Sequence, residues 1–344
     1  MSAPATDNVT AAIAERRELV DDALLETLPI EEPERLYTAS RHLLDAGGKR
    51  LRPSVLLLTA EALTETPPLS QSYRAFGPDD MDIMAAAVSV EVIQSFTLIH
   101  DDIMDDDDLR RGVPAVHRAF DLDTAILAGD TLYSKAFECM LQTGAPSENS
   151  VRALEELATT CTEICEGQTM DVAFESQDTV STSEYLEMVK LKTAVLYAAS
   201  AAIPGLLLGA DDDTVDSLHQ YGIDVGMAFQ IQDDLLDLTM SSEQLGKQRG
   251  SDLVENKQTL ITLHARQQGV DVEGLVDTDS VEAVTEAEID AAVAELERVG
   301  SIEYARNTAR ELIASGKDNL TVLEPSPARD VLSGIADYLI ERNY

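Results

Sequence analysis

Apolar residues recur along most of the chain at the spacing of an α-helix rather than of a strand. Four long stretches, many of them rich in Ala, Leu and Met, show this most clearly, at 85–104, 151–174, 183–210 and 215–238. Positions i, i+3, i+4 and i+7 share one face of a helix, so each stretch predicts a helix with a buried face. Alternating runs typical of strands are nearly absent. We therefore predict an all-α protein of about ten or more helices.

Helix-breaking residues gather where connections between helices are expected. Runs rich in Pro, Gly, Ser and Asp occupy 64–80, 143–150, 268–280 and 324–330. None of them divides the chain convincingly, although its 344 residues exceed the usual length of a domain. We expect a disordered N-terminus at residues 1–10 and one large helical domain over residues 11–344.

The segment 194–210 is apolar enough to suggest a membrane helix, but it is too short and Pro204 and Gly205 interrupt it. A helix that is apolar on every side is more simply a core helix of a large bundle. Residues 1–18 lack the apolar run of a signal peptide, and three cysteines are too few for a disulfide framework. We predict a cytoplasmic protein without a membrane span.

Acidic residues dominate the charge of the chain. Its 64 Asp and Glu against 25 Lys and Arg give a formal net charge of −39. Such a surface repels nucleic acid and anionic membranes, so neither is an expected partner. The acid is spread along the whole chain, while 44% of the residues are hydrophobic, which is enough for a folded core. Because molar salt would screen the self-repulsion, we expect an extreme halophile whose protein unfolds in low salt.

Two aspartate clusters share the spacing DDxxD, at 101–105 and 233–237, and each follows an apolar helical stretch. Residues i and i+4 of a helix lie about 5–6 Å apart on one face, so the carboxylates of each cluster should point together. Oxygen ligands shared with substrate phosphates suit Mg²⁺. Two clusters facing across a cavity would suit a diphosphate held through several Mg²⁺ ions. The candidate metal ligands are Asp101, Asp102, Asp105, Asp233, Asp234 and Asp237.

Two other interpretations of these aspartates are weaker. An EF-hand calcium loop beginning at Asp101 would need Gly in its sixth position and Glu in its twelfth, where this chain has Asp106 and Gly112. Acidic surface decoration explains a single DDxxD well, but a second copy after another apolar helix is harder to explain that way. Decoration remains the expected role of residues 106–108, which begin the next loop.

Basic residues gather beside glycine turns and aspartates, although the chain has only seven lysines. The stretches are GGKRLRP at 47–53, LRRG at 109–112, KLKT at 190–193 and LGKQRGSDLVENK at 245–257. Arg and Lys are the usual side-chain ligands of phosphate groups. Their placement therefore agrees with a site for diphosphates.

In order along the chain, these motifs resemble those of the trans-polyprenyl diphosphate synthases, the family of farnesyl and geranylgeranyl diphosphate synthases. The resemblance runs from about residue 35 to the C-terminus and rests on GGKRLRP, DDIMDDDDLRRG, AGD (128–130), EGQTMD (166–171), KT, FQIQDDLLD (229–237) and GKQRGSD. It implies a helical bundle or barrel around a deep apolar cavity, and a homodimer. It also implies Mg²⁺-dependent condensation of isopentenyl diphosphate with dimethylallyl, geranyl or farnesyl diphosphate.

The resemblance implies a role for each matching residue. The aspartate motifs would hold about three Mg²⁺ ions bridged by the substrate diphosphate. The catalytic set is Asp101, Asp102, Asp105, Lys192 and Asp233. The allylic diphosphate is expected on Arg110, Lys192, Thr193, Gln230, Lys247 and Lys257. Isopentenyl diphosphate is expected on Lys49, Arg52 and Arg111, with Arg50 and Gln94 as further contacts.

The implied reaction ionises the allylic C–O bond, and the double bond of isopentenyl diphosphate then attacks the cation. Loss of a proton, with the released diphosphate as the base, completes a chain longer by five carbons. Positioning of the two substrates should supply much of the rate.

The length of the product is expected to depend on residues that precede Asp101 on the same helix. Phe96, five positions back, lies about 7.5 Å along the axis, and the small Thr97 lies four back. This pair resembles that of archaeal enzymes making the twenty-carbon product, so we expect geranylgeranyl diphosphate for isoprenoid lipids. Farnesyl (C15) and geranylfarnesyl (C25) diphosphates remain alternatives.

Two rival functions fit the sequence less well. A terpene cyclase would carry a second metal motif of Asn/Ser/Glu type, whereas this chain has DDLLD. A non-catalytic partner subunit of a prenyl synthase would typically have lost one aspartate motif, and both are intact here.

Overall fold

The computed structural model describes residues 3–64, 66–77, 79–174, 177, 179–241, 248–278 and 283–341. Nearly all regular structure in this part is helical, so the all-α prediction is confirmed, and its two short strands form one antiparallel hairpin. The elements of the N-terminal half are α1 Ala3–Thr27, α2 Glu34–Asp45, α3 Leu51–Leu63, α4 Ile83–Met104, β1 Leu109–Arg110, β2 Val113–Pro114, α5 Val116–Ala119, α6 Leu122–Leu141 and α7 Ser147–Phe174.

The C-terminal half is helical in all its described elements. They are α8 Thr182–Val189, the π-helical η1 Lys190–Ala194, α9 Val195–Leu208, α10 Asp212–Thr239, α12 Ser251–Val254, α13 Leu260–Gln267, the 3₁₀ turn η2 Glu273–Leu275, α14 Glu286–Arg298, α15 Ser301–Asn319, the 3₁₀ turn η3 Leu320–Val322 and α16 Pro327–Glu341. The helices cover the four stretches predicted from periodicity, and the predicted breakers largely coincide with connections.

The chain forms two compact units, each described below by itself. Unit 1 comprises residues 1–161, 199–219 and 320–334, and unit 2 comprises residues 162–198, 220–319 and 335–344. The chain passes from one unit to the other within α7, α9, α10 and α16, and once more between α15 and η3. One domain over residues 11–344 stays a prediction.

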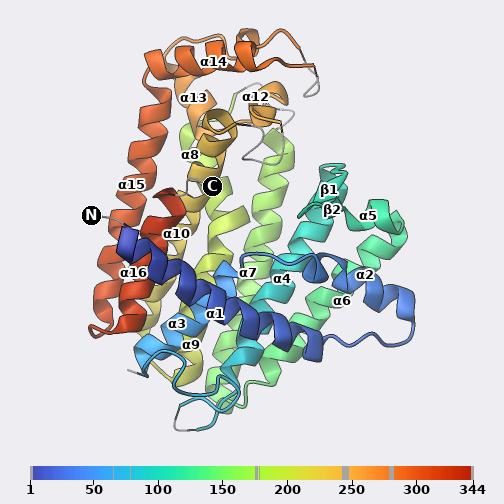
Figure 1. The fold of residues 1–344 in the computed structure, drawn as a ribbon, viewed down its shortest axis with the longest axis vertical. Helices are drawn as coiled ribbons and strands as arrows, with labels where there is room; N and C mark the ends of the chain where they lie inside the picture. The colour runs from blue at the N-terminus through green and yellow to red at the C-terminus, as the bar shows by residue number, and fades with distance from the viewer. Residues whose placement is uncertain are drawn as a thin grey trace. The chain divides into compact units, whose positions relative to one another are not determined.

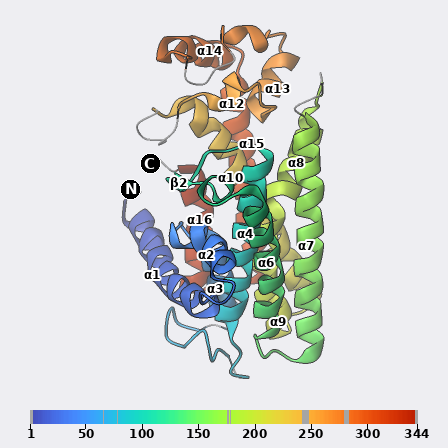
Figure 2. The same ribbon diagram turned by 90° about the vertical axis from the view of Figure 1, so that its right-hand side faces the viewer.

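Helix α4 is the central helix of unit 1. It packs along α6 and also contacts α1, α2, α3 and α5, and Figures 1 and 2 show α4 and α6 side by side. The Asp82 side chain accepts a hydrogen bond from the Ala85 N–H at 2.9 Å and so caps the first turn. Residues 83–93 are buried throughout, which drives the helix into the core. The helix ends at Met104, within the first aspartate motif.

Order begins earlier in the chain than the predicted disorder of residues 1–10 implies. Helix α1 begins at Ala3, and Val9 is buried. Val9 packs against Gly334 of α16, where an added Cβ would lie 2.5 Å from its Cγ2 atom. Ala12 and Ile13 are buried as well, so an apolar face holds this end of α1 against unit 1.

Close helix packing through glycine characterises unit 2. An added Cβ would lie 2.3 Å from Ala198 Cα at Gly222 and 2.6 Å from Ala194 Cα at Gly226. These glycines are one turn apart on α10, so α10 approaches the η1–α9 backbone more closely than any side chain would allow. Elsewhere in unit 2, α13 contacts α8, α14 and α15, and Figure 1 shows α14 lying across one end of α15.

Two helical stretches have the length and apolarity of a membrane span, Ile83–Met104 and Thr182–Leu208. In each, the most apolar window is largely buried inside the structure, 72% and 78% respectively. They are core helices, as the sequence predicts for 194–210.

Candidate active site

The first aspartate motif lies at the C-terminal end of α4, in unit 1. Asp105 is the C-cap, and its N–H donates to the Asp101 carbonyl at 2.9 Å. Asp101 is half-buried and Asp105 is exposed, and their spacing places them on one face of the helix. These two carboxylates are thus placed to bind a cation from solvent.

Asp102 differs from its neighbours because its side chain is fully buried and paired with Arg110. Asp102 Oδ1 accepts from Arg110 Nε at 2.6 Å and from Nη2 at 2.5 Å. Burial raises the pKa of the Asp102 carboxyl, and the Arg110 charge offsets this only in part. Asp107 contacts the same guanidinium at 2.8 Å, so Asp107 is more than the surface decoration expected for residues 106–108. The contacts give Asp102 the role of orienting Arg110; that it binds metal stays a prediction.

The hairpin that follows presents two consecutive arginines. Strands β1 and β2 pair with Arg110 opposite Val113, leaving Arg111 and Gly112 as a two-residue turn. Both turn residues have positive φ, 54° and 77°, as a type I′ turn requires. Arg111 is an unusual residue there, and its guanidinium donates to the Leu43 carbonyl at 2.8 Å.

The GGKRLRP loop turns the chain sharply into α3. Gly47 and Gly48 have φ values of 88° and 153°, and Arg50, the N-cap of α3, has φ 48°. Lys49 is exposed and Arg52 is half-buried, so both can be reached by a substrate. The Arg50 side chain is only 1% exposed. The loop therefore presents two of its three cations to solvent and directs the third inward.

An aromatic cluster surrounds Phe96 on the α6 side of α4. The Phe96 ring meets the rings of His100 and Tyr133 edge-on, with centroids 4.9 Å and 5.3 Å away. His100 also contacts the Ile126 carbonyl at 3.2 Å. An added Cβ at Gly129 would lie 2.2 Å from His100 Nε2, so this glycine of the AGD motif makes room for the imidazole. His100 is thus a packing residue.

Three predicted residues of unit 2 form one hydrogen-bonded chain. Thr193 Oγ1 donates to Gln230 Oε1 at 3.1 Å, and Gln230 Nε2 donates to Asp234 Oδ1 at 3.0 Å. The buried Tyr185 hydroxyl donates to the other oxygen of Asp234. Burial, together with the charges of Asp252 and Asp233, raises the pKa of Asp234 to about 8, although the two hydrogen bonds oppose the rise.

Lys192 lies in the π-helical segment η1, a local form that often marks functional sites. Its Nζ contacts Asp171 Oδ2 at 2.5 Å. An added Cβ at Gly167 would lie 2.3 Å from the Lys192 backbone nitrogen, so α7 touches η1 directly at that glycine. The EGQTMD motif thus makes two contacts with Lys192: Gly167 packs against its backbone, and the Asp171 carboxylate pairs with its Nζ.

The second aspartate motif lies at the end of α10. Asp233 is half-buried, whereas Asp237 is buried and accepts from Ser251 Oγ at 2.9 Å and from the Asp252 N–H at 3.2 Å. Lys257 lies beyond, its Nζ 3.1 Å from Glu255. Lys247 lies outside the described residues.

Sequence reasoning missed several partners of these residues. They are Glu91, Asp171 and Tyr185. Glu91 had a visible signal, because it is the one acid in the apolar stretch 83–100. Asp171 belongs to a recognised motif, but its partner could not be read from spacing. Tyr185 gave no signal beyond a place on a helix.

Comparisons with known proteins now decide the family. The polyprenyl synthetase family model matches residues 33–296. The chain belongs to the polyprenyl synthetase family. It is 67% identical over 341 residues to a geranylfarnesyl diphosphate synthase of Natronomonas pharaonis, covering 98% of this chain and 99% of that protein. The predictions of a polyprenyl diphosphate synthase and of prenyl chain elongation are thereby confirmed.

Solved structures of this family agree with the fold. A geranylgeranyl pyrophosphate synthetase from Geoglobus acetivorans matches with a TM-score of 0.85 and 47% identity, covering 96% of this chain and 99% of that one. A polyprenyl synthase from Caulobacter crescentus CB15, complexed with calcium and isoprenyl diphosphate, matches with a TM-score of 0.82 and 29% identity, each chain being covered to 98%. The predicted isoprenoid synthase fold is thus confirmed.

The donor set of each aspartate motif fits a hard divalent cation. All six side chains offer carboxylate oxygens, the ligands that Mg²⁺ prefers. The raised pKa of Asp234 reflects burial and crowded acids, and a nearby cation would relieve that crowding. Among the described residues, no three Asp, Glu, His or Cys side chains converge to hold a metal unaided. Mg²⁺ commonly keeps several waters and binds substrate phosphate oxygens together with one or two carboxylates.

Proposed function

We propose that this protein condenses isopentenyl diphosphate with allylic diphosphates in a Mg²⁺-dependent reaction and that its main product is the 25-carbon geranylfarnesyl diphosphate. The observation that carries the chemistry is the surface pair Asp101 and Asp105 next to Arg110, a cation oriented by a buried carboxylate. The product length is supported by the 67% identity to a geranylfarnesyl diphosphate synthase. The predicted C20 product is therefore replaced by its C25 alternative.

Each unit contributes side chains with a proposed role. In unit 1, Asp101 and Asp105 bind metal, Arg110 binds the allylic diphosphate, and Lys49, Arg52 and Arg111 bind isopentenyl diphosphate, with Gln94 as a further contact. In unit 2, Lys192, Thr193, Gln230 and Lys257 bind the allylic diphosphate, and Asp233, Asp234 and Asp237 bind metal. About three Mg²⁺ ions, when bound, supply positive charge that stabilises the leaving diphosphate. The calcium and isoprenyl diphosphate in the Caulobacter enzyme support this assignment.

Elongation is tested with farnesyl diphosphate, labelled isopentenyl diphosphate and Mg²⁺ in molar KCl. We expect label in longer prenyl alcohols after dephosphorylation, and none when EDTA replaces Mg²⁺. Asp101→Asn should lower kcat by about 100-fold or more, because a neutral amide is a poor Mg²⁺ ligand. The matched control is Asp123→Asn, which changes an acid on the first turn of α6. Full activity of Asp101→Asn, or activity in EDTA, would contradict the metal site.

The orientation of Phe96 explains how a chain could pass twenty carbons. Its ring is held on the α6 side of α4 by His100 and Tyr133. The position one turn before Asp101 is then occupied by the small Thr97. We expect Thr97→Phe to shorten the product to 15 or 20 carbons and Phe96→Ala to leave C25 as the main product. A product longer than C25 from Phe96→Ala would instead mean that the Phe96 side chain limits the length of the product, as predicted from the sequence.

The protein is further proposed to be a cytoplasmic homodimer. Helix α6 exposes Leu122, Ile126, Leu127 and Tyr133, an apolar surface that a second subunit would cover. Light scattering in molar KCl tests this. A monomer with full activity would contradict it, and Leu127→Glu should weaken a dimer that uses this face.

A further inference from the structure

We propose that Arg50 does not bind substrate but positions Arg111 through their shared partner Glu91, and so sets the affinity for isopentenyl diphosphate. This inference rests on the proposed function, in which Arg111 binds that diphosphate. Arg50 was predicted as a direct substrate contact, and its surroundings favour an indirect role.

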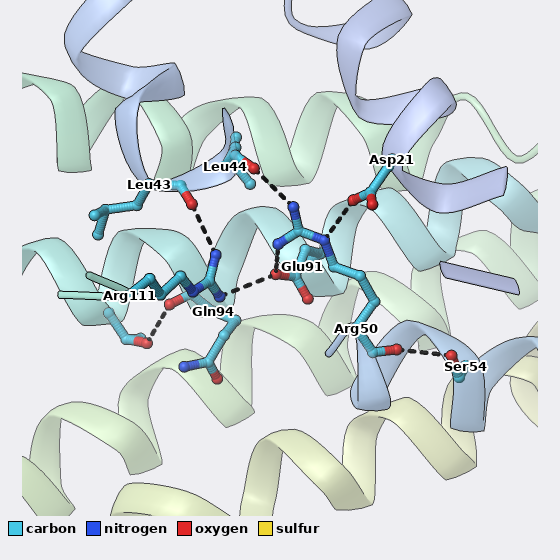
Figure 3. Close-up of polar contacts among 9 residues, drawn as sticks. Asp21, Leu43, Leu44, Arg50, Ser54, Glu91, Gln94 and Arg111 are labelled. Carbon is cyan, nitrogen blue, oxygen red and sulfur yellow. Dashed lines mark hydrogen bonds and ion pairs between the residues drawn. The ribbon is translucent and has the colours of Figure 1, made fainter. Parts of the chain in front are cut away.

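Every nitrogen of the Arg50 guanidinium has a partner inside unit 1. Nε donates to Asp21 Oδ1 at 2.8 Å, Nη2 to the Leu44 carbonyl at 2.8 Å, and Nη1 to Glu91 Oε1 at 2.5 Å. Figure 3 shows the guanidinium between these groups. The side chain is 1% exposed, which leaves no surface for a diphosphate.

Glu91 joins the two arginines through one oxygen atom. Its Oε1 accepts from Arg50 Nη1 and lies 3.4 Å from Arg111 Nη2, as Figure 3 shows. The Glu91 side chain is 4% exposed, whereas Arg111 keeps 19% of its side chain exposed. The buried Glu91 carboxylate thus pairs with both the buried Arg50 and the partly exposed Arg111. In Figure 3 the amide of Gln94, one turn along α4, points away from this cluster.

The backbone at both arginines needs these contacts. Arg50 and Arg111 have φ values of 48° and 54°, in the left-handed region that non-glycine residues seldom adopt. Such strain persists only where surrounding contacts over-determine it. The conformation of Arg111, and with it the direction of its side chain, therefore depends on the two contacts of its guanidinium, the Leu43 carbonyl at 2.8 Å and the Glu91 carboxylate at 3.4 Å.

Charge explains why Glu91 needs Arg50 as well. Burial by itself lowers the pKa of Arg111, and the nearby Arg50 charge adds to this, while Glu91 opposes it. Without Arg50, the buried Glu91 carboxylate would keep Arg111 as its remaining ion-pair partner among the described residues and would draw it inward. Gly48 keeps the two guanidinium groups close, because an added Cβ there would lie 3.1 Å from Arg111 Cζ and 3.2 Å from Arg50 Nη1.

The test compares R50M, E91Q, R111M and R50M/R111M by steady-state kinetics in molar KCl, with each substrate varied separately. We expect R50M and E91Q to raise KM for isopentenyl diphosphate by about 10-fold or more, since a charge-assisted contact is misplaced. KM for the allylic diphosphate should change by less than about twofold. KM for isopentenyl diphosphate in R50M/R111M should equal that in R111M within about twofold, because the effects of residues that act through one group are not additive.

The matched control is R16M. Arg16 and Glu61 form an equally buried pair in unit 1, each 1% exposed and 2.6 Å apart. R16M should lower the melting temperature as R50M does, yet leave KM for isopentenyl diphosphate unchanged.

Three results would overturn the inference. They are parallel rises of both KM values in R50M, a KM rise in R16M equal to that in R50M, and additive effects in R50M/R111M. If R50M fails to fold, E91Q and E91Q/R111M decide the question by the same criteria. A wild-type protein without elongation activity would refute the proposed function instead, so the two failures are distinguishable.

Discussion

Burial separates the roles of neighbouring acids and cations that look alike in the sequence. Asp102 is fully buried beside Arg110, while Asp101 and Asp105 reach the surface. Arg50 is buried, whereas Lys49 and Arg52 in the same motif are exposed and half-buried, respectively. The motif identifies these residues as a group, but the direction of each side chain depends on backbone conformation and on partners far along the chain, such as Glu91.

Asp234 predicts a pH dependence of stability in the metal-free protein. Its pKa in the folded state is about 8, against 3.8 ordinarily, so the folded protein binds the extra proton between these pH values. Stability should therefore fall as pH rises through this window. The measurement is the melting temperature in EDTA and molar KCl from pH 5 to pH 8. Asp234→Asn should flatten the slope relative to wild type, and an identical slope in both would contradict the assignment.

At the scale of elements, the spacing of apolar residues predicted the helices but not the contacts between them. The four long apolar stretches became α4, α7, the α8–η1–α9 run and α10. The π-helical form of η1 and the hairpin at 109–114 were not predicted, because both depend on packing rather than on apolar spacing. Two glycine-dependent contacts, at Gly129 and Gly167, explain why the AGD and EGQTMD motifs contain glycine at all.

Gly167 predicts a coupled loss of stability and binding. In Gly167→Ala the new Cβ would meet the Lys192 backbone at 2.3 Å, and α7 would be pushed from η1. We expect a loss of about 1–3 kcal/mol in the free energy of unfolding, typical of overpacking, and a higher KM for the allylic diphosphate. Gly205→Ala is the control, since its added Cβ meets only side-chain atoms at 3.2 Å or more. Equal effects of the two variants would contradict the role of Gly167.

For the whole molecule, the property that follows most directly from the sequence is its formal net charge of −39. The 64 acidic residues outnumber the 25 basic ones, and acids occur in both units. The relative at 67% identity comes from Natronomonas pharaonis. The division into two compact units could not be foreseen, because four of the five crossings between them lie within helices and no linker marks the boundary.

Salt should therefore control folding of the whole protein. Repulsion among the acids is screened over about 3 Å at 1 M salt but over about 30 Å at 0.01 M. We expect the melting temperature to rise steeply with KCl and helical circular dichroism to be lost in low salt. Urea denaturation at several KCl concentrations gives the salt dependence of the free energy of unfolding. Stability that is independent of salt would contradict the halophilic assignment.

The most direct test of the central claim is the use of geranylgeranyl diphosphate as the allylic substrate. Wild-type protein is incubated with it, labelled isopentenyl diphosphate and Mg²⁺ in molar KCl, and the dephosphorylated alcohols are sized. A labelled 25-carbon alcohol is the predicted result, because a geranylfarnesyl diphosphate synthase must carry out this last addition. Label incorporated with farnesyl diphosphate but not with geranylgeranyl diphosphate would contradict the C25 product, and no label with either would contradict elongation itself.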